Sequence, residues 1–235
     1  MLIYQLAMAK HYNKDVSRLL SAVHEDYLKA IYLLQRHHET VTNAALARAM
    51  AVAPASATNM VKKLDDLSLV EHVPYQGVTL TALGEQVALE VLRHHRLVEL
   101  FLHQALGMPW DQIHAEADRL EHVISEQLED AIAASLGNPR IDPHGDPIPS
   151  KEGEIAHIKG RPLSAVPAGG TYQLVRVLVQ DSERLVYLAE LGLRPGVCLM
   201  LRQRAPFEGP LLVAVDGEHH ALAHDLAAAL LVVDT

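Results

Sequence analysis

The chain has few cysteine and aromatic residues. Its single cysteine, Cys198, excludes an intrachain disulfide. Aromatic residues make up only 4% of a chain that is 49% hydrophobic, so we expect a core of Leu, Val, Ala and Ile, which suits helices packed on helices. No apolar run reaches the roughly 18–20 residues that a membrane span needs. Residues 1–20 also lack the charge, apolar block and small cleavage residues of a signal peptide. These absences predict a cytoplasmic protein without a membrane partner.

Charge is distributed unevenly along the sequence. The net charge of −9 argues at first sight against nucleic-acid binding. Residues 1–80, however, hold 8 Lys+Arg against 7 Asp+Glu, whereas residues 81–150 hold 4 against 12 together with 6 of the 15 histidines. Residues 151–235 hold 8 against 10. Carboxylates and imidazoles concentrated in the middle third suggest a cation site, although charge alone favours a solvated acidic helical surface.

Hydrophobic periodicity and turn residues divide the 235-residue chain into three parts. Helices are expected in residues 21–39, 42–50 and 54–67, followed by a β-hairpin in residues 69–81 and a long helix that begins after Thr81 and ends before Gly107. A further helix is expected from Asp111 to about Leu136, and the Pro- and Gly-rich residues 137–150 are expected to lead into a linker. We therefore predict a mainly α protein. Its domains are a winged helix-turn-helix (1–80), a helical domain (81–150) and a small β-barrel module (151–235).

Two helices, a three-residue turn, a third helix and a hairpin are the arrangement of a winged helix-turn-helix. Small polar side chains at the start of the third helix can reach base edges, and lysines one turn later can neutralise phosphates. A winged helix used for protein contacts is the alternative. The weak local charge implies few phosphate contacts per copy, so DNA binding requires a dimer. The predicted DNA-binding residues are Pro54, Ala55, Ser56, Thr58, Asn59, Lys62 and Lys63 on the helix, with Tyr75 and Gln76 in the wing.

Two expected helices carry imidazoles and carboxylates at helical spacing. One pair at i, i+4 lies on the long helix, and four such residues on the next helix fall within about 100° of one another, beside its apolar stripe. Oxygen and nitrogen donors without sulfur suit Mn²⁺ or Fe²⁺ better than structural zinc. The sequence contains no His-Glu-x-x-His run, so it does not indicate a zinc peptidase. It also shows no nucleophile or other enzyme signature. The candidate ligands are His95, Glu99, His114, Asp118, Glu121 and His122.

Three segments together resemble the diphtheria-toxin-repressor and manganese-transport-regulator family. They are HEDYLKAIY at 24–32, VLRHHRLVELFL at 91–102 and IHAEADRLEHVIS at 113–125. Within them, H-R-L-x-E and E-H-x-x-S follow one another in the order that the family shows. The resemblance covers about residues 21–150, and the last 75 or so residues resemble the SH3-like module of the longer members. It implies a homodimer that binds a palindromic operator, and about two metal ions per subunit without an organic cofactor.

The resemblance also implies ligands for each of the two ions. The first site joins the DNA-binding and dimerisation domains, and the second takes an additional ligand from the third domain. Asp181 is the expected additional ligand, with Gln180 and Glu183 as alternatives. The first site would use Asp26, Asp118, Glu121 and His122, and the second His95, Glu99, His114 and Asp181.

Departures from the family's patterns bear on the ion. The iron-responsive branch has methionine and cysteine at the positions of Asp26 and Asp118, whereas the manganese branch has carboxylates at both. Mn²⁺ is therefore expected first and Fe²⁺ second. Short members of the manganese branch have a glutamate at the position of Lys29, so two separated sites are favoured over a paired cluster.

The predicted function is a metal-dependent DNA-binding regulator, expected to repress genes of manganese or iron homeostasis and not to be an enzyme. The alternative is a winged-helix regulator that answers to an organic ligand or a partner protein. In that case the acidic and histidine residues would form structural ion pairs. Trp110, at the start of the second metal-ligand helix, is expected to pack between domains.

Overall fold

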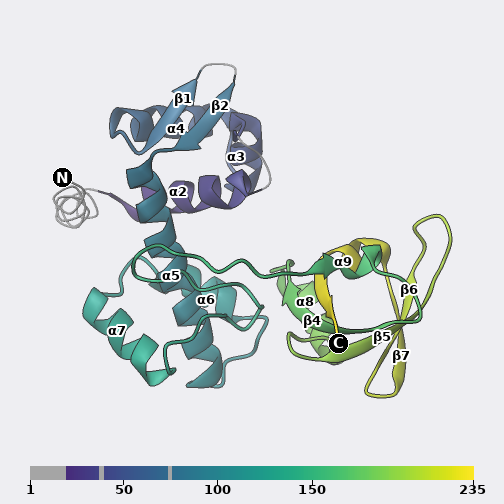
Figure 1. Cartoon of the computed structure of the whole chain (residues 1–235). Helices are drawn as coiled ribbons and strands as arrows, with labels where there is room; N and C mark the ends of the chain where they lie inside the picture. Colours follow the sequence, from purple (N-terminus) through teal and green to yellow (C-terminus); the bar gives the residue numbers. More distant parts are fainter. Residues whose placement is uncertain (1–19, 37–39, 74–75) are drawn as a thin grey trace. The chain divides into compact units, whose positions relative to one another are not determined.

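The computed structural model describes residues 20–36, 40–73 and 76–235 (Figure 1). Residues 1–19 of the lead-in before Ser21 therefore lie outside the described residues, and so does the wing residue Tyr75. The chain forms two compact units. One holds the described residues up to His94 together with Lys151–Gly153, and the other holds His95–Ser150 and Glu154–Thr235. Within the described ranges, no helix combines the length and apolarity that a membrane crossing requires.

The first unit contains the predicted winged helix-turn-helix (Figure 1). Thr42 caps the second helix by accepting a hydrogen bond from the Ala45 N–H, and Pro54 begins the third, where its missing N–H costs nothing. The core side chains Leu28, Leu46 and Leu64 come from all three helices and are fully buried. The elements are α2 (Ala22–Gln35), α3 (Asn43–Ala49), α4 (Pro54–Asp66), and the antiparallel strands β1 (Val70–Val73) and β2 (Gly77–Leu80).

The long helix α5 (Ala82–Gln104) begins after Thr81, as predicted. The hydroxyl of Thr81 accepts a hydrogen bond from the Gly84 N–H in the first turn. The single helix expected from Asp111 to about Leu136 was wrong, because the structure has two, α6 (Ile113–Leu120) and α7 (Glu126–Ser135). Ser125 caps α7 through the Leu128 N–H, so the chain changes direction where the apolar repeat had suggested continuity.

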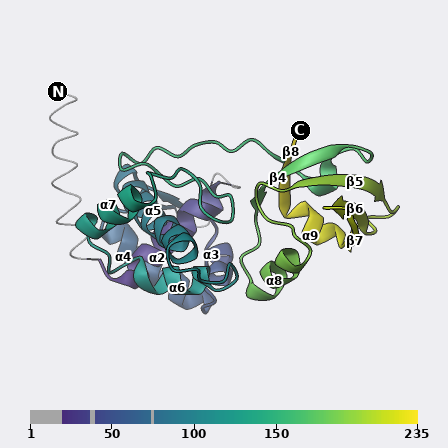
Figure 2. The same cartoon turned by 90° about the horizontal axis from the view of Figure 1, so that it is seen from below.

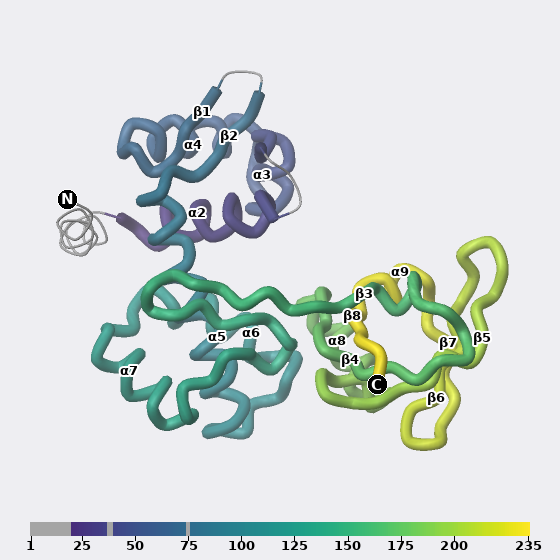
Figure 3. Tube along the Cα trace, in the orientation of Figure 1, coloured from purple at the N-terminus to yellow at the C-terminus, as the bar shows by residue number. Residues whose placement is uncertain are grey.

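The stretch after α7 has no helix or regular strand until Arg161, and its path can be followed in Figure 3. Composition predicted only that residues 137–150 lead into a linker, but residues 142 and 144–149 are buried. Asp142 Oδ1 accepts hydrogen bonds from the backbone N–H groups of His144 and Asp146, at 2.8 and 2.9 Å. These bonds fold residues 142–146 into a tight turn, which we call the acidic loop.

The C-terminal part is a six-stranded antiparallel sheet accompanied by α8 (Ser182–Glu190) and α9 (His224–Ala228), seen from below in Figure 2. Its strand order is β3-β8-β4-β5-β6-β7. Since β3 and β7 are not paired with each other in this order, the predicted closed barrel is not confirmed. The strands are β3 (Arg161–Pro162), β4 (Thr171–Val177), β5 (Cys198–Arg204), β6 (Leu211–Val215), β7 (Glu218–Leu222) and β8 (Leu230–Asp234), with a 3-10 turn η1 (Leu163–Ala165).

The sheet shares its hydrophobic core with the helices of the same unit. Trp110 is 3% exposed and clusters with Val98 and Ile113 and with the sheet residues Leu174 and Leu199. Trp110, which was expected to pack between domains, thus belongs to a cluster that combines residues of the helical region with residues of the sheet. The helices and the sheet are thereby held together where α5, α6 and the acidic loop meet.

Candidate metal centre

His95 lies at the centre of a polar cluster between α5 and α6. Its Nδ1 atom is 2.5 Å from Glu121 Oε2 and 3.3 Å from Asp118 Oδ1. Its Nε2 atom is 3.0 Å from His114 Nδ1 and 3.1 Å from Glu99 Oε1. The His95 side chain is 4% exposed and those of Glu99 and Glu121 are at most 1% exposed, whereas the Asp118 side chain is 47% exposed.

Helical spacing explains how these side chains meet. His95 and Glu99 are four residues apart on α5, and His114 and Asp118 are four apart on α6, so each pair occupies one helix face. Glu121 is the C-cap of α6 and is 1% exposed. His122 follows in the turn, with its Nε2 atom 3.2 Å from Glu121 Oε1.

Ligand atoms of His95, His114 and Asp118 lie within 4.8 Å of one another, and we call these residues the helix group. A second set, Glu99, Asp142 and His144, meets the same criterion and is called the loop group. The loop group is fully buried: Glu99 and His144 are 0% exposed and Asp142 is 5% exposed. It joins α5 to the acidic loop.

Polar atoms of the loop group lack hydrogen-bond partners. Over the described residues, these include Glu99 Oε2 and both ring nitrogens of His144. His144 Nδ1 approaches Glu99 Oε1 only to 3.8 Å, beyond hydrogen-bond length. Buried carboxylates and imidazoles without partners carry a free-energy cost that a bound cation removes.

The two carboxyl groups of the loop group respond to burial in opposite directions. Burial, with the nearby charges of Glu99 and Asp146, raises the pKa of Asp142 from its usual 3.8 to about 8. Burial also opposes ionisation of Glu99, but His95, His114 and His144 outweigh it and hold the Glu99 pKa well below its usual value. Burial acts to lower the pKa of His144, yet Glu99, Asp142 and Asp146 raise it. The loop group thus retains protons that a metal ion would displace.

The donor chemistry of both groups fits a divalent cation. All six residues offer carboxylate oxygen or imidazole nitrogen, the ligands that Mn²⁺ and Fe²⁺ accept. The only sulfur nucleophile, Cys198, is exposed on β5 and belongs to neither group. The orphaned buried atoms of Glu99 and His144 are the feature that best matches an ion.

The remaining predicted ligands are Asp26 and Asp181. Asp26 is half-buried on α2, in the first unit, so its approach to the ligands on α6 stays a prediction. Asp181 is exposed at the N-cap of α8, where its carboxylate accepts a hydrogen bond from the Arg184 N–H and pairs with the Arg184 side chain. The alternatives Gln180 and Glu183 are exposed too.

Sequence reasoning missed Asp142 and His144. Both stand in the run DPHGD, whose Pro and Gly content suggested only a turn. An aspartate and a histidine two residues apart in such a turn were the available signal. The burial that makes them candidates comes from contacts with α5 and the sheet, which local sequence does not reveal.

The predicted DNA-binding residues lie mostly on an exposed face of α4. Thr58 is the exception, because it is half-buried and its hydroxyl is engaged within the protein. The Asn43 side-chain amide donates a hydrogen bond to Thr58 Oγ1 at 3.1 Å, and that hydroxyl donates to the Pro54 carbonyl at 2.9 Å. The exposed members are Pro54, Ala55, Ser56, Asn59, Lys62 and Lys63, together with Gln76 beside the hairpin.

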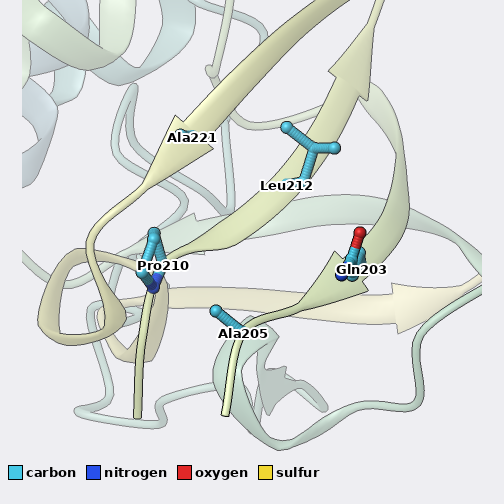
Figure 4. A pocket seen from close by; sticks show the side chains of 5 residues that line it. All are labelled: Gln203, Ala205, Pro210, Leu212 and Ala221. Atoms are coloured by element: carbon cyan, nitrogen blue, oxygen red, sulfur yellow. The ribbon is translucent and has the colours of Figure 1, made fainter. Parts of the chain in front are cut away.

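A small pocket opens on the C-terminal sheet (Figure 4), and none of its lining residues belongs to either metal-ligand group. Its lining is Gln203, Ala205, Pro210, Leu212 and Ala221. Because this lining offers neither a carboxylate nor an imidazole, the pocket is not a candidate metal site.

Three family models match successive parts of the chain. Residues 19–78 match the N-terminal DNA binding domain of iron dependent repressors, and residues 81–150 match their metal binding and dimerisation domain. Residues 161–234 match the FeoA domain. A solved manganese-dependent transcriptional repressor in complex with manganese is 37% identical, with a TM-score of 0.83, and the match covers 90% of this chain and all of that one. The chain belongs to the diphtheria-toxin-repressor and manganese-transport-regulator family.

Other members of this family are similar over most of their length. The iron-dependent repressor IdeR of Mycobacterium leprae is 28% identical over 220 residues, which are 88% of this chain and 95% of that protein. The solved structure of the manganese regulator SloR is 32% identical with a TM-score of 0.74, covering 90% of this chain and 98% of that one. This family consists of metal-dependent, DNA-binding transcriptional repressors, and the chain has the corresponding DNA-binding, dimerisation and FeoA-like regions.

Proposed function

We propose that this repressor is activated by Mn²⁺, with Fe²⁺ as the second choice. The observation that carries the proposal is the loop group, in which buried atoms of Glu99 and His144 have no hydrogen-bond partner in the described part of the chain. Relatives are named for either metal, iron for the Mycobacterium leprae repressor and manganese for the solved complex. The carboxylates Asp26 and Asp118 favour manganese, because hard oxygen donors suit it better than sulfur does.

The proposal assigns about two ions to each subunit. The first would use Asp26, Asp118, Glu121 and His122, as the family resemblance implies. The second would draw on His95, Glu99 and His114. We add Asp142 and His144 to the second set, because their ligand atoms lie near those of Glu99, and we prefer them to Asp181, whose carboxylate caps α8.

The proposed mechanism begins with repulsion between acidic residues. When bound, the divalent cation supplies positive charge that offsets this repulsion. Asp26 stands on α2 of the DNA-binding domain, whereas Glu121 and His122 follow α6. Shared ligation by these residues would fix α2, and with it the recognition helix α4, relative to the dimer core. The difference in metal affinity between the fixed and loose arrangements is the free energy that shifts the population.

The DNA partner proposed here is a palindromic operator bound by a homodimer. Residues 1–80 act as the DNA-binding domain, 81–150 as the metal-binding and dimerisation domain, and 151–235 as the third domain. With a charge of only +1 in residues 1–80, one copy makes few phosphate contacts, so two recognition helices at a fixed spacing are needed for specific binding.

Selection of duplexes from a random pool tests this function. We expect wild-type protein to enrich a two-fold-symmetric sequence in Mn²⁺ and none in chelator, and a mobility-shift assay on that sequence to show the same dependence. Asp118→Ala should lose the Mn²⁺ response. Asp130→Ala, an exposed acid on α7 outside both groups, is the matched control and should retain it. Sequence-specific binding that persists undiminished in chelator would overturn the proposal and favour an organic ligand or a partner protein.

A further inference from the structure

Strand β4 contains a bulge that redirects one arginine. Its pairing with β8 passes from Leu174 to Arg176 and leaves Val175 as an extra residue. Tyr172 and Leu174 face the core, and regular alternation would send Arg176 to the same side. The bulge instead turns the fully buried Val177 into the core. Arg176 is thereby released from the hydrophobic side of the sheet.

The redirected Arg176 points at the acidic loop. Its guanidinium forms an ion pair with Asp146, and both side chains are largely buried, at 19% and 5% exposure. The same Asp146 carboxylate accepts a hydrogen bond from Arg96 on α5, at 3.3 Å. Asp146 therefore lies between an arginine of the sheet and an arginine of the metal-binding helix.

The backbone of β4 supports the same loop. The Val177 N–H donates a hydrogen bond to the His144 carbonyl at 2.8 Å. Gly145 lies so close to β4 that a Cβ atom there would be 2.1 Å from the Val175 carbonyl oxygen, and its φ of +86° favours glycine independently. The bulged strand and the loop thus meet backbone to backbone at this glycine.

Contacts on the opposite side of the loop come from the helical region. The Trp110 indole N–H donates to the Pro143 carbonyl at 3.2 Å, and its ring stacks on the His144 ring with centroids 5.2 Å apart. Arg96 donates to the Pro147 carbonyl at 2.5 Å. Asp142 and His144 are consequently held between helices that belong to the metal centre and a strand that belongs to the C-terminal sheet.

We infer that Arg176 is a positioning residue through which the C-terminal sheet sets the metal affinity of the loop group. The inference rests on the proposed metal binding by Glu99, Asp142 and His144. The ion pair of Arg176 is with Asp146, which is not itself a proposed ligand. It neutralises Asp146, which otherwise repels the nearby Asp142, and it holds the loop in the conformation that presents Asp142 and His144 to Glu99. A buried ion pair adds little to stability when both partners are present, but removal of one partner leaves the other uncompensated.

Mn²⁺ titration of the full-length protein tests this role, with calorimetry for affinity and stoichiometry and with the fluorescence of Trp110, the only tryptophan, as a local reporter of His144. For Arg176→Met we expect the Mn²⁺ affinity of the loop group to fall about tenfold or more, in the range of changes to residues that support metal ligands. The Mn²⁺ affinity of the first proposed site, which uses Asp26, Asp118, Glu121 and His122, should be unchanged. Arg161→Met is the matched control, because Arg161 also belongs to the sheet but pairs with the exposed Asp234. It should titrate like wild type.

Two further variants separate positioning from a loss of folding. Arg176→Lys keeps the charge and should recover most of the affinity that Arg176→Met loses. In Arg176→Met/Asp146→Asn the uncompensated carboxylate is gone, so affinity should exceed that of Arg176→Met alone. In a protein that already carries Glu99→Gln, Arg176→Met should cause no further loss of Mn²⁺ affinity, since both substitutions act on the loop group.

The outcomes distinguish this inference from the function on which it rests. If wild-type protein binds no Mn²⁺, the proposed function fails. If wild-type protein binds Mn²⁺ and Arg176→Met binds it equally well at both proposed sites, the positioning role is wrong. Should Arg176→Met not fold, Arg176→Lys and the double variant decide the matter. An equal loss in both classes, or no advantage of the double variant or of lysine over methionine, overturns the inference.

Discussion

The imidazole of His95 bridges two acidic residues, with Nδ1 2.5 Å from Glu121 and Nε2 3.1 Å from Glu99. Glu121 belongs to the first proposed set of ligands and Glu99 to the second. One histidine therefore contacts both sets of proposed ligands, and its loss should be felt in each.

Replacement of His95 with glutamine should weaken both classes of Mn²⁺ sites. Because the ring also partners a carboxylate that is 1% exposed, we expect the metal-free protein to lose about 1.5–3 kcal/mol of unfolding free energy. Chemical denaturation in chelator measures the second effect and calorimetry the first. His103→Gln, on the same helix but outside both groups, should leave Mn²⁺ binding unchanged. A His95→Gln protein that binds metal like wild type contradicts the prediction.

Mn²⁺ binding by the loop group should strengthen as pH rises. The Asp142 pKa is raised to about 8, so below that pH the metal-free loop group holds a proton that the cation must displace. The apparent affinity should rise about tenfold per pH unit up to that value and then level off. In Asp142→Asn this proton is absent, so binding should be weaker and less dependent on pH. Calorimetry from pH 6 to 9, a range of about 3 units, measures the slope.

The raised pKa of Asp142 also affects the stability of the metal-free protein. Because the folded-state pKa of Asp142 lies above its usual 3.8, its contribution to stability is present at acidic pH and is lost as pH rises through about 8. The depressed pKa of Glu99 acts in the opposite sense, since its contribution is lost as pH falls. Metal should therefore raise the melting temperature more at pH 8 than at pH 6. An equal rise at both values argues against proton displacement by Asp142.

Thr58 should contribute to the stability of the winged helix more than to base recognition. Its hydroxyl connects Asn43 at the start of α3 to Pro54 at the start of α4. Thr58→Val removes both hydrogen bonds and should cost about 1–2 kcal/mol in chemical denaturation, with the relative preference among DNA sequences unchanged. Ser56→Ala, on the exposed face two residues earlier, should show the reverse: unchanged stability and altered DNA binding.

Lys62 is expected to bind phosphate. Lys62→Ala should weaken binding by about the same factor on all duplexes. It should also reduce the slope of log affinity against log salt by about 1 for each phosphate that a lysine no longer neutralises, or about 2 for a dimer. Mobility-shift titrations over a range of salt concentrations measure this slope. Lys159→Ala removes an exposed lysine outside the DNA-binding region and serves as the control. A loss confined to particular base pairs would instead indicate direct reading of bases.

Helical periodicity was a sufficient guide to half of the metal centre. His95 with Glu99, and His114 with Asp118, are recognisable because each pair shares a helix face whatever the rest of the chain does. The same reasoning failed at residues 121–125, where a continuing apolar repeat concealed the end of α6. Leu128, which continues that repeat at helical spacing after Leu120 and Ile124, is 48% exposed. The cap at Ser125 was the local signal for a new helix.

Family membership, the winged helix-turn-helix and the candidate ligands on α5 and α6 followed from the sequence by itself, because motifs and helix faces depend on residues close together in the chain. Only the tertiary structure decided that Asp142 and His144 belong to a buried group and that Arg176 pairs with Asp146 in the same loop. Their position depends on a bulge in β4, a glycine packed against its backbone, and an ion pair across 30 residues from Asp146 to Arg176. Contacts between distant segments arise from packing, whereas composition alone predicted only that this stretch leads into a linker.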